Sequence, residues 1–498
     1  MLNSSQSTFF IAVFILYIAL MIFVGWFFTR KQNNGSDFLT GGRRMPMFLV
    51  VCTSCATLIG TGSAMGSTGE GYSIGLAGAG YTFGSTFALL ILAFAIAPMR
   101  KYNFITTAEE AQFYFAGDKR VRKITAVLTL LAEICFMASH MTGGAKYLQF
   151  ITNMDPTLCK FICLLAFTIY VYIGGYMAVV WTDVIQFSII LVGFVLITLR
   201  IGSHVTGWGQ ITDTFIAAGQ PESTVLFGFG YGGTVLAAVT LLITACLSEM
   251  GASTFRHRIY TAKDADTARK SFIHTAIITT IFSFIPLTLG MCTRVIATNN
   301  GVDFLSNRDF AFPYLCTTVL GPVFGLLLMV AGLSATMSSG DSDAMAGVTI
   351  FMKDVIPEFT GKPVPEDRVK KNSRIALVTF LVLAFFLTLI ATTFMSFVTN
   401  VFGSLMPALV VTTLVGRFWK KVTPDAGVAA MIGGTIFGII YLAVPSVNAW
   451  IVNVFTGPVI PVSLLTLALL VGVSLCTKRP KLSEKEILDI VLSERTDL

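Results

Sequence analysis

Thirteen apolar segments, each long enough to cross a lipid bilayer as a helix, dominate this sequence. A membrane-spanning helix needs about 20 mostly apolar residues, because the hydrocarbon core offers no water to backbone polar groups. Only 12% of the residues are charged, which is about half the fraction in a typical globular domain. We therefore predict an all-α polytopic membrane protein with 13 transmembrane helices. They span residues 8–28, 47–72, 76–98, 124–151, 158–175, 178–202, 233–254, 272–296, 318–351, 375–398, 400–416, 426–445 and 457–476.

The basic residues indicate how these helices are oriented. Of the 34 Lys and Arg residues, 29 lie in one alternating set of loops. Cytoplasmic loops are enriched in Lys and Arg, so this set is predicted to be cytoplasmic. The N-terminus is then outside and the C-terminus inside the cytoplasmic (inner) membrane, which requires an odd number of spans. The net charge of +7 follows from this topology and does not predict nucleic-acid binding.

A cluster of oxygen-bearing side chains lies in the ninth segment, in the stretch AGLSATMSSGDSDAMAG at 331–347. On a helix, one face carries Ala335, Ser338, Ser339 and Ser342, because residues three or four apart lie on the same side. Ionisable groups inside a membrane are costly and usually mark an ion or substrate pathway. Hydroxyl and carboxylate oxygens are the ligands of hard cations. The alternative is that the serines only pack closely while the aspartates face a loop.

Two of the segments are predicted to contain broken helices. Most residues from Gly60 to Glu70 are Gly, Ser or Thr, and glycine weakens a helix and frees its backbone carbonyls. Secondary transporters bind ions and substrates at such breaks near the membrane midplane. Close helix packing through Gly62 and Gly66 is the alternative. The seventh segment, with Glu249 and Gly251, is the second candidate.

Other polar groups fit a transporter better than an enzyme. Asp183 and Gln186 share a helix face, although an aspartate near a helix end is often only a cap. Glu133 and His140 lie in the fourth segment, where a neutral, hydrogen-bonded histidine is favoured over a proton relay. The sequence contains no GxxxxGK[ST] phosphate loop, no His/Cys cluster with metal-site spacing and no nucleophile–base pair. We therefore predict no enzymatic activity.

Four separated motifs are similar to those of the sodium:solute symporter family. They are GSTGEGYSIGL at 66–76, GGYMAVVWTDVIQ at 174–186, RHRIYTAKDADTAR at 256–269 and SATMSSGDS at 334–342. The resemblance implies a LeuT-type fold with two inverted five-helix repeats and broken helices. It divides the chain into a peripheral first span and cytoplasmic loop (1–46), a first repeat (47–202), an external loop (203–232), a second repeat (233–416), two peripheral spans (417–476) and a cytoplasmic tail (477–498).

The resemblance also implies the ion sites. The principal sodium site would use backbone carbonyls of Ala56, Ile59 and Ala335 and the hydroxyls of Ser338 and Ser339. A second cation site, present in some members, would correspond to Asp183, Ser338, Asp341 and Ser342. The family usually has a hydroxyl where this chain has Asp341, so the second site is predicted to hold either a sodium ion or a proton.

The positions implied for substrate binding disfavour a sugar. Ser63, Thr82 and Ala252 stand where sugar-transporting members carry larger polar side chains. Glu133 and Glu249 provide carboxylates instead, close to the expected break at Gly60 and Gly62, and Tyr81 is the expected external lid. We expect a small zwitterion or cation, such as an amino acid or amine. A monocarboxylate such as pantothenate, held by half-helix N-termini, is the alternative.

The resemblance thus implies a sodium-coupled symporter that imports a small organic solute by alternating access, as a monomer in the lipid bilayer. Sodium is the expected coupling ion, with one or two bound and a proton as the alternative. A different class of function, a channel or a sensor whose sodium site is only structural, would share the same fold.

Overall fold

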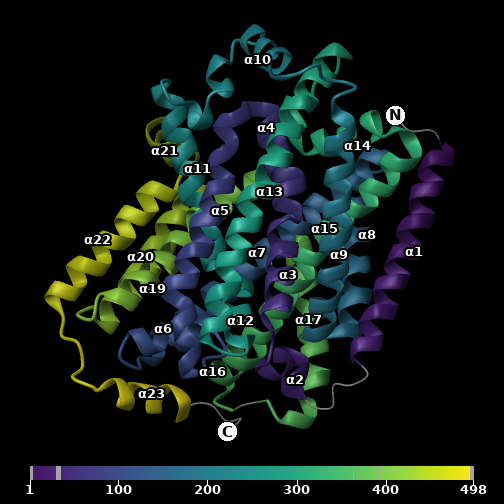
Figure 1. Cartoon of the computed structure of the whole chain (residues 1–498). Helices are drawn as coiled ribbons and strands as arrows, with labels where there is room; N and C mark the ends of the chain where they lie inside the picture. Colours follow the sequence, from purple (N-terminus) through teal and green to yellow (C-terminus); the bar gives the residue numbers. More distant parts are fainter. Residues whose placement is uncertain (1–3, 30–34, 363, 390–392, 494–498) are drawn as a thin grey trace.

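The computed structural model describes residues 4–29, 35–362, 364–389 and 393–493, and within these ranges the chain forms helices but no sheet. Figure 1 shows most long helices running roughly side by side between two ends of a bundle. Residues 390–392 of the predicted span 375–398 lie outside the described part. The same holds for residues 1–3 and 30–34 of the predicted 1–46 unit and for 494–498 of the predicted tail.

Long helices occupy the apolar segments predicted from the sequence. Eleven helical segments among the described residues are long and apolar enough to cross a membrane. One of them, Met47–Tyr102, covers two predicted spans, and α8 has a shorter apolar part, Pro156–Ile169. The count of 13 is therefore not established. Besides α3 and α11, which are described below, the long helices are α1 (Ser4–Thr29), α5 (Ala79–Ile91), α7 (Lys119–Thr152), α8 (Pro156–Gly174), α9 (Tyr176–Ile201), α13 (Ala265–Asn299), α15 (Gly321–Ile350), α17 (Glu366–Thr388), α19 (Gly403–Phe418), α20 (Pro424–Ala443) and α22 (Val459–Cys476).

Both predicted helix breaks are present. Helix α3 (Met47–Leu58) ends at Ile59, which leaves the helical conformation (φ −82°, ψ 13°). The chain continues through a wide turn, η2 (Gly62–Ser67), into α4 (Thr68–Ile74). Helix α11 (Gly232–Gly251) likewise ends at Ala252 (φ −61°, ψ 113°) before α12 (Ser253–Thr261) begins. Each break leaves helix-terminal backbone groups without an intrahelical partner in the middle of the bundle.

Several short helices are not predicted by membrane-length apolar patterns, because they are too short or too polar. They are α2 (Gly35–Thr40), α6 (Thr107–Tyr114), α10 (Trp208–Ala217), α14 (Ala311–Val319), α16 (Ile356–Thr360), α18 (Phe394–Ser396), α21 (Pro445–Phe455) and α23 (Glu484–Ser493). Figure 1 places α10 beyond one end of the bundle and α2, α16 and α23 at the other. Helix α1 starts at the α10 end, so the two termini lie at opposite ends, as an odd number of spans requires.

Helix α15 lies in the interior and carries the serine cluster. Its small residues allow large side chains of neighbouring helices to approach closely. A Cβ atom added at Gly332 would lie 2.5 Å from the Tyr147 hydroxyl, and one at Gly340 would lie 2.6 Å from the Phe167 ring. Ala335, Ser338 and Ser339 are fully buried as a result. The fold thus places the polar face of α15 against the broken helix α3.

Candidate functional site

The residues predicted for the principal sodium site lie together where α3 ends against α15. The Ser338 Oγ donates to the Ala56 carbonyl (3.1 Å) and to the Ala335 carbonyl (3.0 Å). The Ser339 Oγ donates to the carbonyls of Thr57 (2.9 Å) and Ala335 (3.3 Å). The carbonyls of Ala56 and Thr57 belong to the last turn of α3, where helix-terminal oxygens have no intrahelical donor.

This arrangement suits a hard cation. All the groups that meet are neutral oxygens, from two serine hydroxyls and from carbonyls at a negative helix end. Gly60 is essential to the close approach, because a Cβ atom there would lie 2.1 Å from the Ser339 Oγ and 2.8 Å from the Ala335 carbonyl. Ile59, whose carbonyl the resemblance also assigns, is fully buried at the break. A cation at this point would hold α3 and α15 together.

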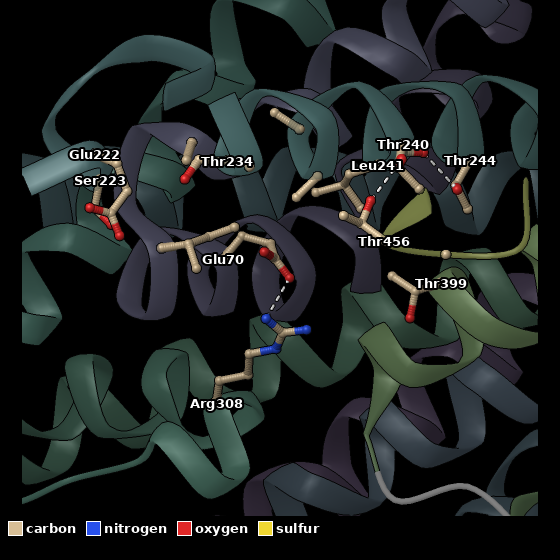
Figure 2. A pocket seen from close by; sticks show the side chains of 16 residues that line it. Glu70, Glu222, Ser223, Thr234, Thr240, Leu241, Thr244, Arg308, Thr399 and Thr456 are labelled. Carbon is tan, nitrogen blue, oxygen red and sulfur yellow. Dashed lines mark hydrogen bonds and ion pairs between the residues drawn. The ribbon is translucent and has the colours of Figure 1, made fainter. Parts of the chain in front are cut away.

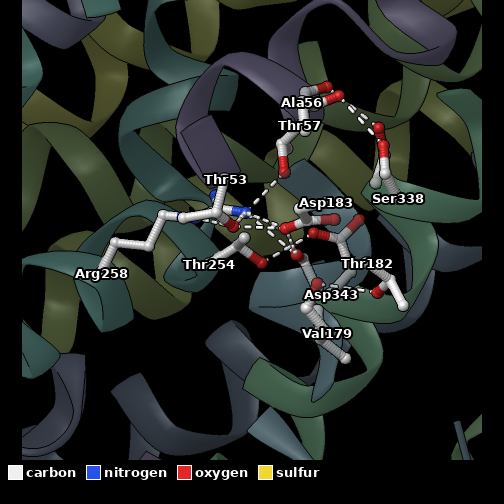
Figure 3. Close-up of polar contacts among 12 residues, drawn as sticks. Thr53, Ala56, Thr57, Val179, Thr182, Asp183, Thr254, Arg258, Ser338 and Asp343 are labelled. Atoms are coloured by element: carbon white, nitrogen blue, oxygen red, sulfur yellow. Dashed lines mark hydrogen bonds and ion pairs between the residues drawn. The ribbon is translucent and has the colours of Figure 1, made fainter. Parts of the chain in front are cut away.

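A buried arginine reaches the region predicted for a second cation. Figure 3 shows the Arg258 side chain extending from α12 to Thr53 and Thr57 on α3 and toward Asp183 on α9. Its Nη2 donates to Thr57 Oγ1 (2.6 Å), Ser342 Oγ (2.9 Å) and Thr53 Oγ1 (3.0 Å). The Asp183 Oδ2 lies 3.8 Å from this nitrogen. One guanidinium therefore links four helices at the level of the ion site.

Two of the three hydroxyls that accept from Arg258, those of Thr53 and Ser342, also donate to Asp183. The Thr53 hydroxyl donates to the Asp183 carboxylate, and so does Ser342 Oγ at 3.3 Å. Asp341 is fully buried on α15, one turn after Ser338. Two of the four predicted second-site residues, Asp183 and Ser342, are thus in contact between α9 and α15, and Arg258, which the sequence did not single out, lies against both. The sequence feature that could have pointed to Arg258 is its position in the motif RHRIYTAKDADTAR at 256–269.

A small central cavity adjoins this ion site. Its volume is about 40 Å³, and its polar wall comprises Thr57, Ser139, His140, Ser248, Glu249 and Asp343. The rest of the lining is largely aromatic, with Tyr81, Phe136, Phe255, Phe394 and Phe402, and Leu58, Gly62, Ala252 and Val398 complete it. Carboxylates beside aromatic faces form an environment that favours an organic cation. The cavity contacts both broken helices, as expected for a transporter's substrate site.

Asp343 is the central polar group of this cavity. Its Oδ2 lies 3.0 Å from His140 Nε2, and its Oδ1 accepts from Thr254 Oγ1 at 2.7 Å. The other ring nitrogen of His140 lies 2.8 Å from Thr61 Oγ1. His140 is thus hydrogen-bonded between helices, as the sequence favoured. Asp343 is one of the two aspartates in the stretch at 331–347, and the sequence did not predict a role for it in substrate binding.

Glu133 occupies a different position from that expected. Its Oε1 accepts from the backbone N–H of Ser253 (2.5 Å), and its Oε2 accepts from Thr254 Oγ1 (3.2 Å). The carboxylate thereby caps the N-terminus of α12, the favourable end of a helix for a negative charge. Glu133 is fully buried and does not line the central cavity.

The other residues predicted to bind substrate divide into two groups. Glu249, Ala252 and Gly62 line the cavity. Gly60 instead packs against Ser339. The Ser63 Oγ donates to the Leu58 carbonyl at 3.0 Å, and Thr82 is buried away from the cavity. Three of the seven residues predicted to bind substrate therefore line the central cavity.

Tyr81 lies between the central cavity and a larger one. A Cβ atom at Gly62 would lie 2.5 Å from the Tyr81 hydroxyl, so the glycine gives room for the ring over the helix break. The larger cavity has a volume of about 370 Å³ and is lined in part by Glu70, Glu222, Thr244, Arg308 and Thr399. Figure 2 shows the Arg308 side chain meeting Glu70 at its edge, with Nη1 2.8 Å from Oε1. We call this cavity the vestibule.

The vestibule and the central cavity follow each other along the same helices. Thr244 lines the vestibule and Ser248, one turn further along α11, lines the central cavity. In the wide turn η10 (Phe397–Phe402), Thr399 lines the vestibule and Val398 the central cavity. Tyr81 and the Phe394 ring both approach Gly66. These contacts outline one path from the α10 end of the bundle to the ion site.

Buried ion pairs lie toward the end of the bundle away from α10. Arg256, on α12, pairs with Glu110 on α6, and Tyr260 Oη also donates to this carboxylate at 2.5 Å. Arg122 lies 3.5 Å from Asp354. All four charged side chains are almost fully buried. These ion pairs join α6 to α12 and α7 to η9 (Phe351–Val355).

Comparison with known sequences identifies the family of the chain. The profile of the sodium:solute symporter family matches residues 38–434. A sodium/pantothenate symporter of Haemophilus influenzae is 24% identical over 439 residues, which cover 84% of this chain and 87% of the relative. An osmoregulated proline transporter of Bacillus subtilis is 23% identical over 484 residues, covering 93% and 94%. A sodium/glucose cotransporter of Vibrio parahaemolyticus is 24% identical, covering 87% and 85%.

Solved structures share the fold. A Na⁺-coupled sialic acid symporter, in a substrate-bound outward-open state, superposes with a TM-score of 0.77 at 18% identity, covering 95% of this chain and 99% of the other. A nucleobase-cation-symport-1 family transporter superposes with a TM-score of 0.57 at 14% identity, covering 91% and 97%. These likenesses establish a LeuT-like arrangement of helices. With the family profile matching most of its length, the chain is a transporter, not an enzyme, and belongs to the sodium:solute symporter family.

Proposed function

We propose that this protein imports a small amine-bearing solute, a zwitterion or an organic cation, together with sodium. The observation that carries the proposal is the central cavity, whose lining combines the carboxylates of Asp343 and Glu249 with five aromatic rings beside the ion site. Neither Lys nor Arg lines this cavity. An ammonium group would satisfy both the carboxylate charge and the aromatic faces.

The position of Glu133 argues against a monocarboxylate substrate. A free carboxylate would need a positive partner, and the α12 N-terminus is the natural one at the second helix break. In the structure the Glu133 carboxylate already accepts from the Ser253 N–H of that terminus. An anionic solute would have to displace a buried internal carboxylate, and so would the carboxylate of a zwitterion at this terminus, but only the zwitterion also brings an ammonium group for Asp343 and Glu249. The pantothenate-type alternative is therefore the weaker of the two.

Alternating access would open the central cavity in turn toward the vestibule and toward the ion pair between α6 and α12. Sodium at Ala56, Ile59, Ala335, Ser338 and Ser339 would hold α3 against α15 and so prepare the cavity for the solute. Once the solute has entered through the vestibule, the Tyr81 side chain would close over it. Separation of α6 from α12, which would act as the inner gate, would then release the sodium ion and the solute. Transport is coupled only if each of these two ligands raises the affinity of the protein for the other.

The topology completes the proposal. Thirteen spans with the N-terminus outside and the C-terminus in the cytoplasm accord with the termini lying at opposite ends of the bundle. The first repeat would comprise residues 47–202 and the second 233–416, each beginning with one of the two broken helices. The units 1–46 and 417–476 would be peripheral and the protein would act as a monomer.

For the second cation site we propose that Arg258 competes with the ion. A cation ligated by Asp183, Ser338, Asp341 and Ser342 would lie close to a guanidinium that already binds the Ser342 oxygen, and like charges at such distances repel. The site would hold sodium, or a proton, only when the guanidinium moves away.

Replacing Arg258 by Gln is accordingly expected to strengthen sodium binding. The Hill coefficient of sodium-dependent thermal stabilisation should rise from about one toward about two, because a second ion then neutralises Asp183. Purified variants titrated with NaCl at constant ionic strength provide the measurement. Arg258→Lys, which keeps the charge, is the matched control, and an additional Asp183→Asn substitution should return the coefficient to about one. An unchanged coefficient in the Gln variant would refute the competition.

The proposed function itself is tested by a binding screen. Amino acids, amines, monocarboxylates and sugars are each added to the purified protein in NaCl and in KCl of equal ionic strength, and thermal stability is measured. We expect amine-bearing compounds alone to stabilise the protein further, and only in sodium. Stabilisation by monocarboxylates instead would favour the pantothenate-type function, and equal stability in both salts would contradict sodium coupling. A channel would show flux that does not saturate with solute.

A further inference from the structure

An apolar groove runs along the outer surface of the bundle, away from the transport path. It lies between α9 and the junction of α14 with α15 and has a volume of about 460 Å³. Ten of its lining residues carry no charge, and the eleventh is Arg200. The lining is Ile189, Val192, Gly193, Leu196, Arg200, Val319, Leu320, Phe324, Leu327, Leu328 and Ala331.

The groove opens on a surface that faces the membrane. Val192 is 58% exposed and Phe324 66% exposed, although both are large apolar side chains. On helices that cross a bilayer such side chains contact lipid. The groove exists because α14 ends at Val319 and α15 starts anew at Gly321, which has a positive φ of 71°. This interruption leaves a notch beside the straight helix α9.

The length of the groove matches one leaflet of a bilayer. Ile189 and Arg200 are 11 residues apart on α9, which corresponds to about 16 Å along a helix at 1.5 Å per residue. Half of a hydrocarbon core of about 30 Å is about 15 Å. An acyl chain that fills the groove would thus reach from the boundary of one leaflet to the midplane.

Arg200 marks the end of the groove at the membrane boundary. It lies in the last turn of α9, two residues before that helix gives way to Gly202. Its side chain is exposed and makes no ion pair with the described residues. A guanidinium binds phosphate oxygens in a bidentate manner, and basic pockets between membrane helices bind anionic lipid headgroups.

We propose that this groove is a binding site for one anionic phospholipid. One acyl chain of the lipid would lie between α9 and the start of α15, and the Arg200 guanidinium would bind the phosphodiester. A bound lipid would fill the notch at Gly321, at the outer start of the helix that carries Ser338 and Ser339. The site is separate from the central cavity and from the vestibule, with which it shares no lining residue.

The test measures lipid retention by the full-length protein. The protein is incorporated into vesicles of equal amounts of phosphatidylethanolamine and phosphatidylglycerol, extracted in mild detergent and examined by native mass spectrometry. We expect the wild type to retain one phosphatidylglycerol. Arg200→Gln should lose it through the headgroup, and Val192→Trp should lose it by filling the groove.

Two matched variants control for general effects. Arg200→Lys keeps the charge and should retain the lipid, as should Val195→Trp, because Val195 is also exposed on α9 but does not line the groove. All three positions are exposed, so sodium-dependent thermal stabilisation should be unchanged in the four variants and would report correct folding. Equal retention in Arg200→Gln and wild type, retention of both lipids without preference, or retention of none by the wild type would each overturn the proposal.

Discussion

The Ser338→Ala/Ser339→Ala double variant is expected to lose sodium-dependent stabilisation and sodium-dependent uptake. Both hydroxyls meet the carbonyls of Ala56, Thr57 and Ala335 within 3.3 Å. Each would supply one ligand oxygen to a bound cation, and a hydrogen bond to a charged group contributes about 1.5–3 kcal/mol. Loss of both should weaken sodium affinity by roughly 100-fold or more. The measurement is a sodium titration followed by thermal stability.

A control on the same helix separates ion binding from folding. Thr349→Ala removes a buried hydroxyl of α15 that donates only to the Met345 carbonyl of its own helix (2.8 Å). This variant should respond to sodium as the wild type does. In KCl the double serine variant should be less stable than the wild type, because its hydrogen bonds to Ala56 and Thr57 are lost, and added NaCl should not stabilise it further. A sodium response that survives the loss of both hydroxyls would mean that sodium binds elsewhere.

Asp343→Asn is expected to have the second large effect, on the solute. Asn keeps the size of the side chain and accepts from Thr254, but it removes the charge that faces the central cavity. We expect the affinity for the amine compound identified in the binding screen to fall by roughly 10- to 100-fold, because a charge-assisted hydrogen bond is replaced by a neutral one. Sodium-dependent stabilisation without solute should remain. Isothermal titration in NaCl measures both quantities.

Glu133→Gln distinguishes the two carboxylates near the cavity. Gln still offers an oxygen to the Ser253 N–H, so α12 should stay in place. If Asp343 alone binds the amine, solute affinity in this variant should be close to that of the wild type. If it falls as far as in Asp343→Asn, Glu133 also acts on the solute, as its place in the fourth segment predicted. An unchanged affinity in Asp343→Asn would contradict the role of Asp343.

The ligands predicted for the principal ion site came from the resemblance to the family, and local rules account for part of that prediction. Periodicity places Ser338 and Ser339 on one face of a helix, and the glycines after Ile59 predict a break whose carbonyls are free. The approach of α3 to α15 came from the resemblance to the family, since no local pattern gives the distance between two helices.

Arg258 and Glu133 could not be assigned from the sequence for a physical reason. A side chain as long as arginine reaches over several ångströms, so its contacts depend on the angle at which α12 leaves the break at Ala252. Glu133 was interpreted as a substrate ligand because a carboxylate within a membrane helix usually needs a cation. The alternative, a helix N-terminus as its partner, appears only when α12 is seen to begin beside α7.

The capping of α12 by Glu133 has a consequence for selection among the many acids that a cell encounters. A carboxylate attached to the protein, and positioned by helix α7, is present at the α12 terminus at an effective concentration of at least millimolar order. A dissolved acid must exceed that concentration, or bind far more tightly, before it occupies the terminus. A transporter of the proposed kind would thus carry a permanent internal competitor for anions, which adds to the repulsion from the Asp343 and Glu249 carboxylates in the cavity itself.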